Sequence, residues 1–133
     1  MEQAALALEA PARPDFRQQT YFSGYGEGWG LYTEWLGTRM GIYETPYEEF
    51  GRLTFEMWRA ARLVIDTGIH AKGWSREEGI RYMMTAYGDT EGAATSEVER
   101  YCGWPGQACA YKVGHNEWVR LRDKARSRLG ARF

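Results

Sequence analysis

The fold class is decided by residues 46–68, PYEEFGRLTFEMWRAARLVIDTG. Apolar residues recur along this stretch at the three- and four-residue spacing of one helix face. They are Phe50, Leu53, Met57, Ala60, Ala61 and Val64. Proline is tolerated in the first turn of a helix, and glycine commonly follows the last turn. The pattern therefore predicts one long helix that begins at Pro46 and ends near Thr67 and Gly68.

Further helices are predicted on both sides of this segment, over about residues 2–9, 26–40, 76–87, 96–102 and 105–129. Ser75 and Glu78 have the spacing of a capping box, which starts the third of these. Gly41, Gly88 and Gly130 are placed to end three of them. Because no repeat and no long strand pattern is present, the sequence predicts an all-α fold, a helical domain of about five to six helices. It predicts a single domain over residues 1–133.

The composition excludes several classes of function. The formal net charge is −1, so no basic excess is present and no nucleic-acid partner is expected. No apolar run is long enough to cross a bilayer, and no signal peptide is visible. The chain as written is therefore expected to be cytoplasmic, without a membrane partner. A secreted or periplasmic location is the alternative if the N-terminus is missing. Cys102 and Cys109 are too few for a disulfide framework and are expected to be buried free thiols.

Aromatic residues are numerous, with six Trp and nine Tyr in 133 residues. Large aromatic side chains usually lie in cores, interfaces or ligand clefts. The excess indicates that some of them bury against something outside this chain.

The stretch YGEGWGLYTE, residues 25–34, has glycine at three alternate positions. Each glycine costs a helix about 1 kcal/mol relative to alanine. That cost is accepted where another group must approach the backbone closely. Glu27 and Glu34 are seven residues apart and lie on one helix face. Two interpretations stay open: a tight helix–helix contact beside surface carboxylates, or a poorly solvated functional carboxylate.

The end of the long helix has charged residues at helical spacing. Arg59 and Arg62 precede Asp66 by seven and four residues, so both are expected to reach its carboxylate as a structural ion pair. His70 is expected just past the helix, after Gly68. A lone histidine is more often a packing or capping residue than a catalyst, although the neighbouring glycines favour a catalytic role.

Gln107, Tyr111 and His115 are each four residues apart, which predicts one polar stripe on the last helix. If the stripe faces a cleft, it can donate hydrogen bonds to a developing oxyanion. If it faces water, it has no such role, and the spacing does not separate the two cases.

Together these segments resemble a bacterial family known as domain-of-unknown-function family 885, whose members look like helical zinc metallopeptidases of the gluzincin type. The resemblance rests on residues 25–32, on 59–70 followed by 73–77, and on 99–101 with 104–107. Residues 111–112 and 129–130 also agree. The resemblance covers the chain from about Leu6 onward.

The resemblance implies roles for individual residues. Glu27 would be a zinc ligand that completes a two-histidine, one-glutamate site. His70 and Tyr111 would stabilise the tetrahedral intermediate of peptide hydrolysis. The residues implied to line the substrate cleft are Arg100, Tyr101 and Gln107. Departures from the family's pattern occur at Cys102, Cys109 and His115.

The family's upstream metal motif, of the type His-Glu-x-x-x-x-His-His, does not occur in this sequence, which has two histidines. We therefore expect the C-terminal segment of a zinc metallopeptidase-like protein, a fragment of a larger catalytic domain. Zinc and a peptide substrate are expected only in the full-length context, and the chain alone is expected to be inactive. One half of a split enzyme and a non-enzymatic helical binding module are the alternatives. Loss of neighbouring helices exposes apolar surface, so self-association or pairing with a missing segment is also expected.

Overall fold

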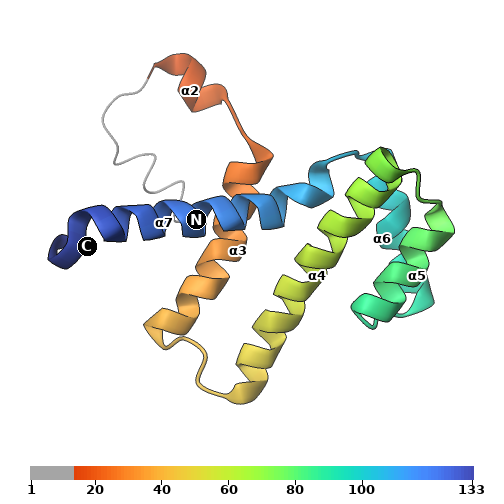
Figure 1. The fold of residues 1–133 in the computed structure, drawn as a ribbon, viewed down its shortest axis with the longest axis horizontal. Coiled ribbons are helices and arrows are strands. Elements are labelled where there is room, and N and C mark those ends of the chain that lie inside the picture. The colour runs from red at the N-terminus through yellow and green to blue at the C-terminus, as the bar shows by residue number, and fades with distance from the viewer. Residues whose placement is uncertain (1–13) are drawn as a thin grey trace.

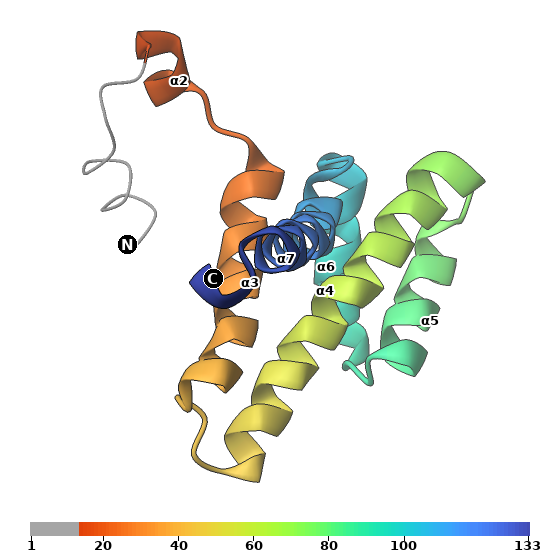
Figure 2. The same cartoon turned by 60° about the vertical axis from the view of Figure 1, so that its left-hand side comes forward.

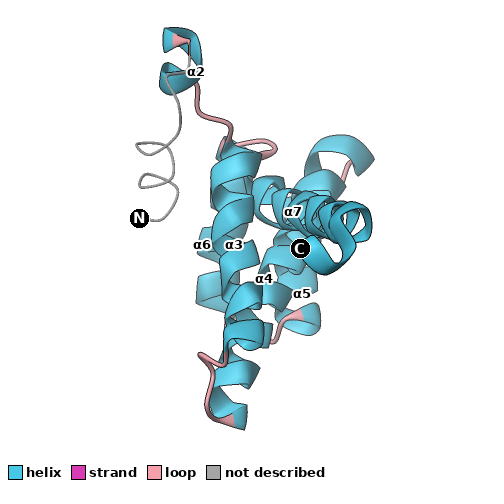
Figure 3. Cartoon of the chain, turned by 90° about the vertical axis from the view of Figure 1, so that its left-hand side faces the viewer, coloured by secondary structure: helices cyan, strands magenta, loops and turns pink. Residues whose placement is uncertain are grey.

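The computed structural model describes residues 14–133, which form helices and connecting turns without any strand (Figure 3). The elements are α2 (Asp15–Gln19), α3 (Ser23–Met40), α4 (Pro46–Lys72), α5 (Arg76–Ala86), α6 (Glu91–Gly103), the 3-10 turn η1 (Gln107–Cys109), α7 (Ala110–Leu129) and the 3-10 turn η2 (Gly130–Arg132). The predicted all-α fold is confirmed. The helix predicted over residues 2–9 lies outside the described residues. No described helix combines the length and the apolar character needed to cross a bilayer.

Local capping explains where the two central helices begin. Thr45 accepts a hydrogen bond from the backbone of Glu48, whose side chain bonds back to the Thr45 backbone, and Pro46 follows at the first helical position. The same reciprocal arrangement joins Ser75 and Glu78 at the start of α5. Each box satisfies backbone donors that a helix start leaves unpaired. The predicted box at Ser75 is confirmed.

Three predicted helix boundaries are wrong. The helix α4 continues past Gly68 to Lys72, so His70 lies in its last turn. Gly73 ends it with φ 71°, and Trp74 closes the end by donating its backbone N–H to the carbonyl of Gly68 at 3.0 Å. Gly68 serves another purpose, because the indole of Trp74 packs where its side chain would be.

The other two errors lie in the last third of the chain. The helix α6 begins at Glu91, earlier than the predicted residue 96, because Thr90 caps it by accepting a hydrogen bond from the backbone of Ala93. The last helix begins at Ala110 and not at residue 105. Gly106 has a φ of 83°, which breaks the helical path and leaves the single turn η1 ahead of α7.

The helices pack in two groups that meet along α4 and α7. The helices α3 and α4 diverge from their connecting loop. The helix α7 crosses the N-terminal half of α3 (Figures 1 and 2). On the other side of α4, the helices α5 and α6 and the turn η1 enclose the main apolar core. Its buried members are Ala61, Ile65, Ile80, Met83, Ala94, Val98, Tyr101 and Ala108.

The α3–α7 crossing explains one of the glycines of residues 24–30. A side chain at Gly28 would collide with the backbone of Gly114 and would lie 2.8 Å from the backbone nitrogen of His115. A Cβ at Gly30, in contrast, would meet no other atom within 4 Å. Beside the crossing, the Trp118 ring contacts those of Tyr25, Trp29 and Tyr32, with centroids 4.7–6.0 Å apart. The helix–helix contact therefore accounts for Gly28.

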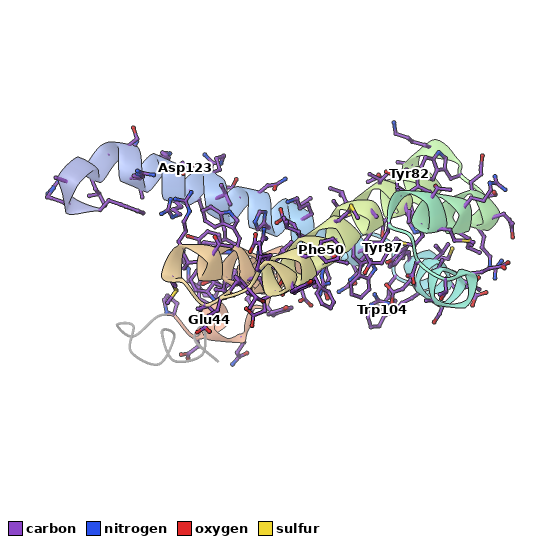
Figure 4. All side chains as sticks on the ribbon, turned by 90° about the horizontal axis from the view of Figure 1, so that it is seen from below. Glu44, Phe50, Tyr82, Tyr87, Trp104 and Asp123 are labelled. Atoms are coloured by element: carbon purple, nitrogen blue, oxygen red, sulfur yellow. The ribbon has the colours of Figure 1, made fainter. Side chains whose placement is uncertain are left out.

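The apolar stripe of α4 faces outward over much of its length. Phe50 is 70% exposed, and Leu53, Met57 and Val64 are also exposed, whereas the charged residues Arg52, Arg62 and Asp66 of the same helix are buried. Exposed aromatic residues lie elsewhere too, as at Trp104, which Figure 4 labels together with Phe50. Several large aromatic side chains are thus exposed on this chain, and their burial against an outside partner stays a prediction.

Candidate functional site

Arg62 is the centre of a cluster where α4, α6, η1 and the start of α7 meet. Its side chain is only 2% exposed. The guanidinium carbon lies 4.5 Å from the ring centre of Tyr111 and 5.3 Å from that of Tyr101. Its Nη2 donates a hydrogen bond to the side-chain oxygen of Gln107 at 3.3 Å. Three of the residues predicted from the sequence therefore contact one buried cation.

Glu97 completes this cluster from α6, and sequence reasoning missed it. One carboxylate oxygen accepts hydrogen bonds from the Tyr101 hydroxyl at 2.7 Å and from Nη2 of Arg100 at 2.9 Å, and it lies 4.0 Å from Nε of Arg62. Burial acts to raise the pKa of Glu97, but these hydrogen bonds and the two arginines hold it below its ordinary value. Burial and Glu97 together raise the pKa of Tyr101. The carboxylate is thus ionised and Tyr101 keeps its proton.

The predicted ion pair of Asp66 with Arg59 and Arg62 is wrong. The two carboxylate oxygens of Asp66 accept hydrogen bonds from the backbone N–H of Gly106, at 3.1 and 3.0 Å. Asp66 is 3% exposed and fixes the turn that leads into η1. Cys109 lies beside it, and burial followed by the Asp66 charge raises the pKa of the thiol to about 11. Asp66 therefore positions Gln107 and Tyr111 indirectly, through the turn.

The prediction that both cysteines are buried free thiols is only partly confirmed. Both are free, but Cys102 is exposed and Cys109 is only half-buried. Cys102 lies near the end of α6, on the side away from the core residue Tyr101.

His70 is held by the backbone of the same cluster. Its Nε2 lies 3.0 Å from the carbonyl oxygen of Tyr101, so Nε2 donates in the neutral ring and Nδ1 is an acceptor. The side chain is exposed at the end of α4. The structure thus brings His70 next to the Tyr101 backbone.

Glu27 lies in the N-terminal half of α3. It is half-buried and interacts electrostatically with Tyr21, whose ring packs over Gly26. Burial raises the pKa of Tyr21, and the charges of Glu27 and Tyr111 raise it further. Glu27 and Tyr111 both act electrostatically on Tyr21, but no hydrogen bond or ion pair joins Glu27 to the Arg62 cluster within the described residues.

The predicted polar stripe of Gln107, Tyr111 and His115 is wrong. Gln107 lies in η1, and His115 is 6% exposed against α3. Nδ1 of His115 lies 3.2 Å from Asn116 Oδ1 and 3.5 Å from Nζ of Lys112. Lys112 in turn donates to Glu56 on α4 at 2.6 Å, so His115 belongs to a charged layer between helices. A regular spacing of four did not imply a common surface, because the helix begins after Gln107.

The sequence profile of the family described as "Bacterial protein of unknown function (DUF885)" matches residues 1–133. The chain belongs to this family. No curated protein matches the sequence. The predicted resemblance is therefore confirmed at the level of the family, and the roles that it implies for Glu27, His70 and Tyr111 stay predictions.

The described residues of this DUF885 chain do not by themselves fit a zinc ion. Within residues 14–133, no group of three or more His, Cys, Asp or Glu side chains converges to hold a metal. Structural and catalytic zinc sites need at least three protein ligands in a fixed geometry. Glu27 is one carboxylate, and His70 and His115 are engaged elsewhere. Any metal centre of this DUF885 chain requires ligands beyond this set.

Proposed function

We propose that this chain forms the substrate-binding side of a peptide-hydrolysing site of the zinc-metallopeptidase kind and is not a complete enzyme alone. The observation that supports it is the convergence of Tyr101, Tyr111 and Gln107 on the buried Arg62, with Arg100 at their edge. These are residues for which the family resemblance implies contact with substrate.

The Tyr111 hydroxyl is the group best placed to bind a peptide carbonyl. Tyr111 is half-buried, and its hydroxyl has no hydrogen-bond partner among residues 14–133. The ring centre lies 4.5 Å from the guanidinium carbon of Arg62, and Tyr111 interacts electrostatically with Arg100. A fixed donor in a partly buried, positively charged site favours an oxygen that gains negative charge. Tyr111 can therefore hold a substrate carbonyl and stabilise it during addition.

The proposal assigns Glu27 as one ligand of zinc and takes the remaining ligands from another segment or another chain. The outward-facing apolar side chains of α4 are a surface on which such a partner can pack, because soluble proteins rarely leave such stripes uncovered. The chain is then one of two parts of a site. Without the other part it binds peptide but does not cleave it.

Peptide binding tests this function directly. We expect the isotope-labelled chain to bind N-acetylated trialanine amide weakly, with NMR shifts at Tyr111, and not to hydrolyse it when zinc is added. Tyr111→Phe removes one hydrogen bond of about 0.5–1.5 kcal/mol and should weaken binding about 2- to 10-fold.

Tyr47→Phe is the matched control, because Tyr47 is 87% exposed at the far end of α4. It should leave the affinity unchanged. The proposed function is overturned if no peptide binds, or if Tyr111→Phe and Tyr47→Phe have the same effect. Zinc-dependent cleavage of the peptide by the chain alone would contradict the proposal that this chain is not a complete enzyme.

A further inference from the structure

Arg59 has an unusual environment one turn before Arg62. Its guanidinium carbon lies 4.4 Å from the ring centre of Trp58, 5.2 Å from that of Phe55 and 5.5 Å from that of Tyr111. Nε and Nη1 are buried and have no hydrogen-bond partner among the described residues. Nη2 also has no hydrogen-bond partner among the described residues and is not fully buried, so it is the nitrogen that a ligand can reach.

No carboxylate of the described chain neutralises Arg59. Glu34 interacts with it electrostatically, but the two form no ion pair within 4.0 Å in residues 14–133. The oxygens of Glu56 are engaged by Arg52 at 2.7 Å and by Lys112 at 2.6 Å. Arg62 and Arg100, in contrast, share Glu97. Arg59 is therefore the cation beside Tyr111 whose charge is left without a counterion in this part of the chain.

A partly buried guanidinium without a counterion is costly, and such a group is retained where it meets an anion. Cation–π contacts with three rings reduce that cost but accept no hydrogen bond. A carboxylate that reaches Nη2 neutralises the delocalised charge of the whole guanidinium. The aromatic rings fix the guanidinium in place, so a ligand would not have to order it.

We infer that Arg59 binds the C-terminal carboxylate of a peptide whose carbonyl lies at Tyr111. This inference rests on the proposed function. The Arg59 guanidinium carbon and the Tyr111 ring centre are 5.5 Å apart. A peptide spans at most about 3.3–3.6 Å per residue. Arg59 and Tyr111 are therefore close enough for one short peptide to contact both, and the substrate class is peptides with a free C-terminus.

The test compares ligands that differ only in where the carboxylate lies. The intact labelled chain is titrated with N-acetylated trialanine acid, with its C-terminal amide, with an amide peptide that has a central glutamate, and with sodium acetate. We expect the acid to bind about 10- to 100-fold more tightly than the amide, as a charge-assisted hydrogen bond implies. The glutamate peptide and acetate should bind no better than the amide.

Arg59→Gln should abolish the difference between acid and amide while leaving amide binding in place. Arg81→Gln is the matched control, because Arg81 is exposed on α5, and it should retain the full difference. If Arg59→Gln does not fold, as judged by circular dichroism, the comparison of the four ligands on the unaltered chain still decides the matter.

Three results would overturn the inference. Equal binding of acid and amide removes the carboxylate site but leaves the proposed function standing. If the glutamate peptide or acetate binds as much more tightly than the amide as the acid does, the carboxylate need not be a C-terminus. Binding of no peptide at all refutes the proposed function and this inference together.

Discussion

Gly28→Ala is expected to destabilise the fold by opening the α3–α7 crossing. The added Cβ would collide with the Gly114 backbone and would lie 2.8 Å from the nitrogen of His115, whereas ordinary contacts begin at 3.4 Å. Both obstacles are backbone, so no flexible side chain can move aside. The helices must separate by about 0.6 Å or more, which loosens the packing of Trp118 on α3.

The magnitude follows from two opposing terms. Overpacking of a close contact costs about 1–3 kcal/mol, and occasionally more. Alanine gains up to about 1 kcal/mol over glycine in a helix interior. Because the collision involves the backbone of both helices, we expect a net loss of about 1–3 kcal/mol in the free energy of unfolding. At roughly 3–5 °C per kcal/mol for a chain of this size, the melting temperature falls measurably.

Gly30→Ala is the matched control on the same helix. Nothing lies within 4 Å of a Cβ at Gly30, so only the helix-propensity term remains, and stability should rise by up to about 1 kcal/mol. Urea unfolding followed by far-ultraviolet circular dichroism measures both variants. If Gly28→Ala is as stable as the unaltered chain or as Gly30→Ala, the argument from the crossing is refuted.

Two further predictions concern titrating groups. Burial lowers the pKa of His115 in the folded chain below its ordinary value, so the unfolded chain binds a proton at this residue more readily than the folded chain does. The contribution of His115 to stability is therefore complete above about pH 6.5 and is lost as the pH falls through the pKa of the folded chain. The urea midpoint should drop from pH 7.5 to pH 5, and less so in His115→Gln; parallel profiles would contradict this. Burial and Asp66 raise the pKa of the Cys109 thiol to about 11, so this thiol is protonated at pH 8. Iodoacetamide should therefore label the exposed Cys102 at least about tenfold faster than Cys109 at that pH. Mass spectrometry of two variants, each with one cysteine replaced by serine, measures the two labelling rates. Equal labelling rates would show that Cys109 is not shielded.

The candidate site could be predicted only in part from the sequence. Tyr101, Tyr111 and Gln107 meet at Arg62, as residues of one site should. The pairing of Asp66 with Arg62 and the stripe through His115 were wrong, because both assumed that helical spacing alone selects the partner. Spacing fixes which side chains share a helix face, but it does not say what packs on that face.

The sequence by itself determined the all-α class and the starts of α4 and α5. The class follows from the helical spacing of apolar residues. The helix starts depend on hydrogen bonds between residues three apart, such as Ser75 and Glu78, which are local in the sequence. Only the tertiary structure decided that Arg62 is buried, that Asp66 accepts hydrogen bonds from Gly106, and that His70 lies against the Tyr101 carbonyl. Each of these contacts joins helices distant in the sequence, so its geometry follows from how the helices cross and not from any local pattern.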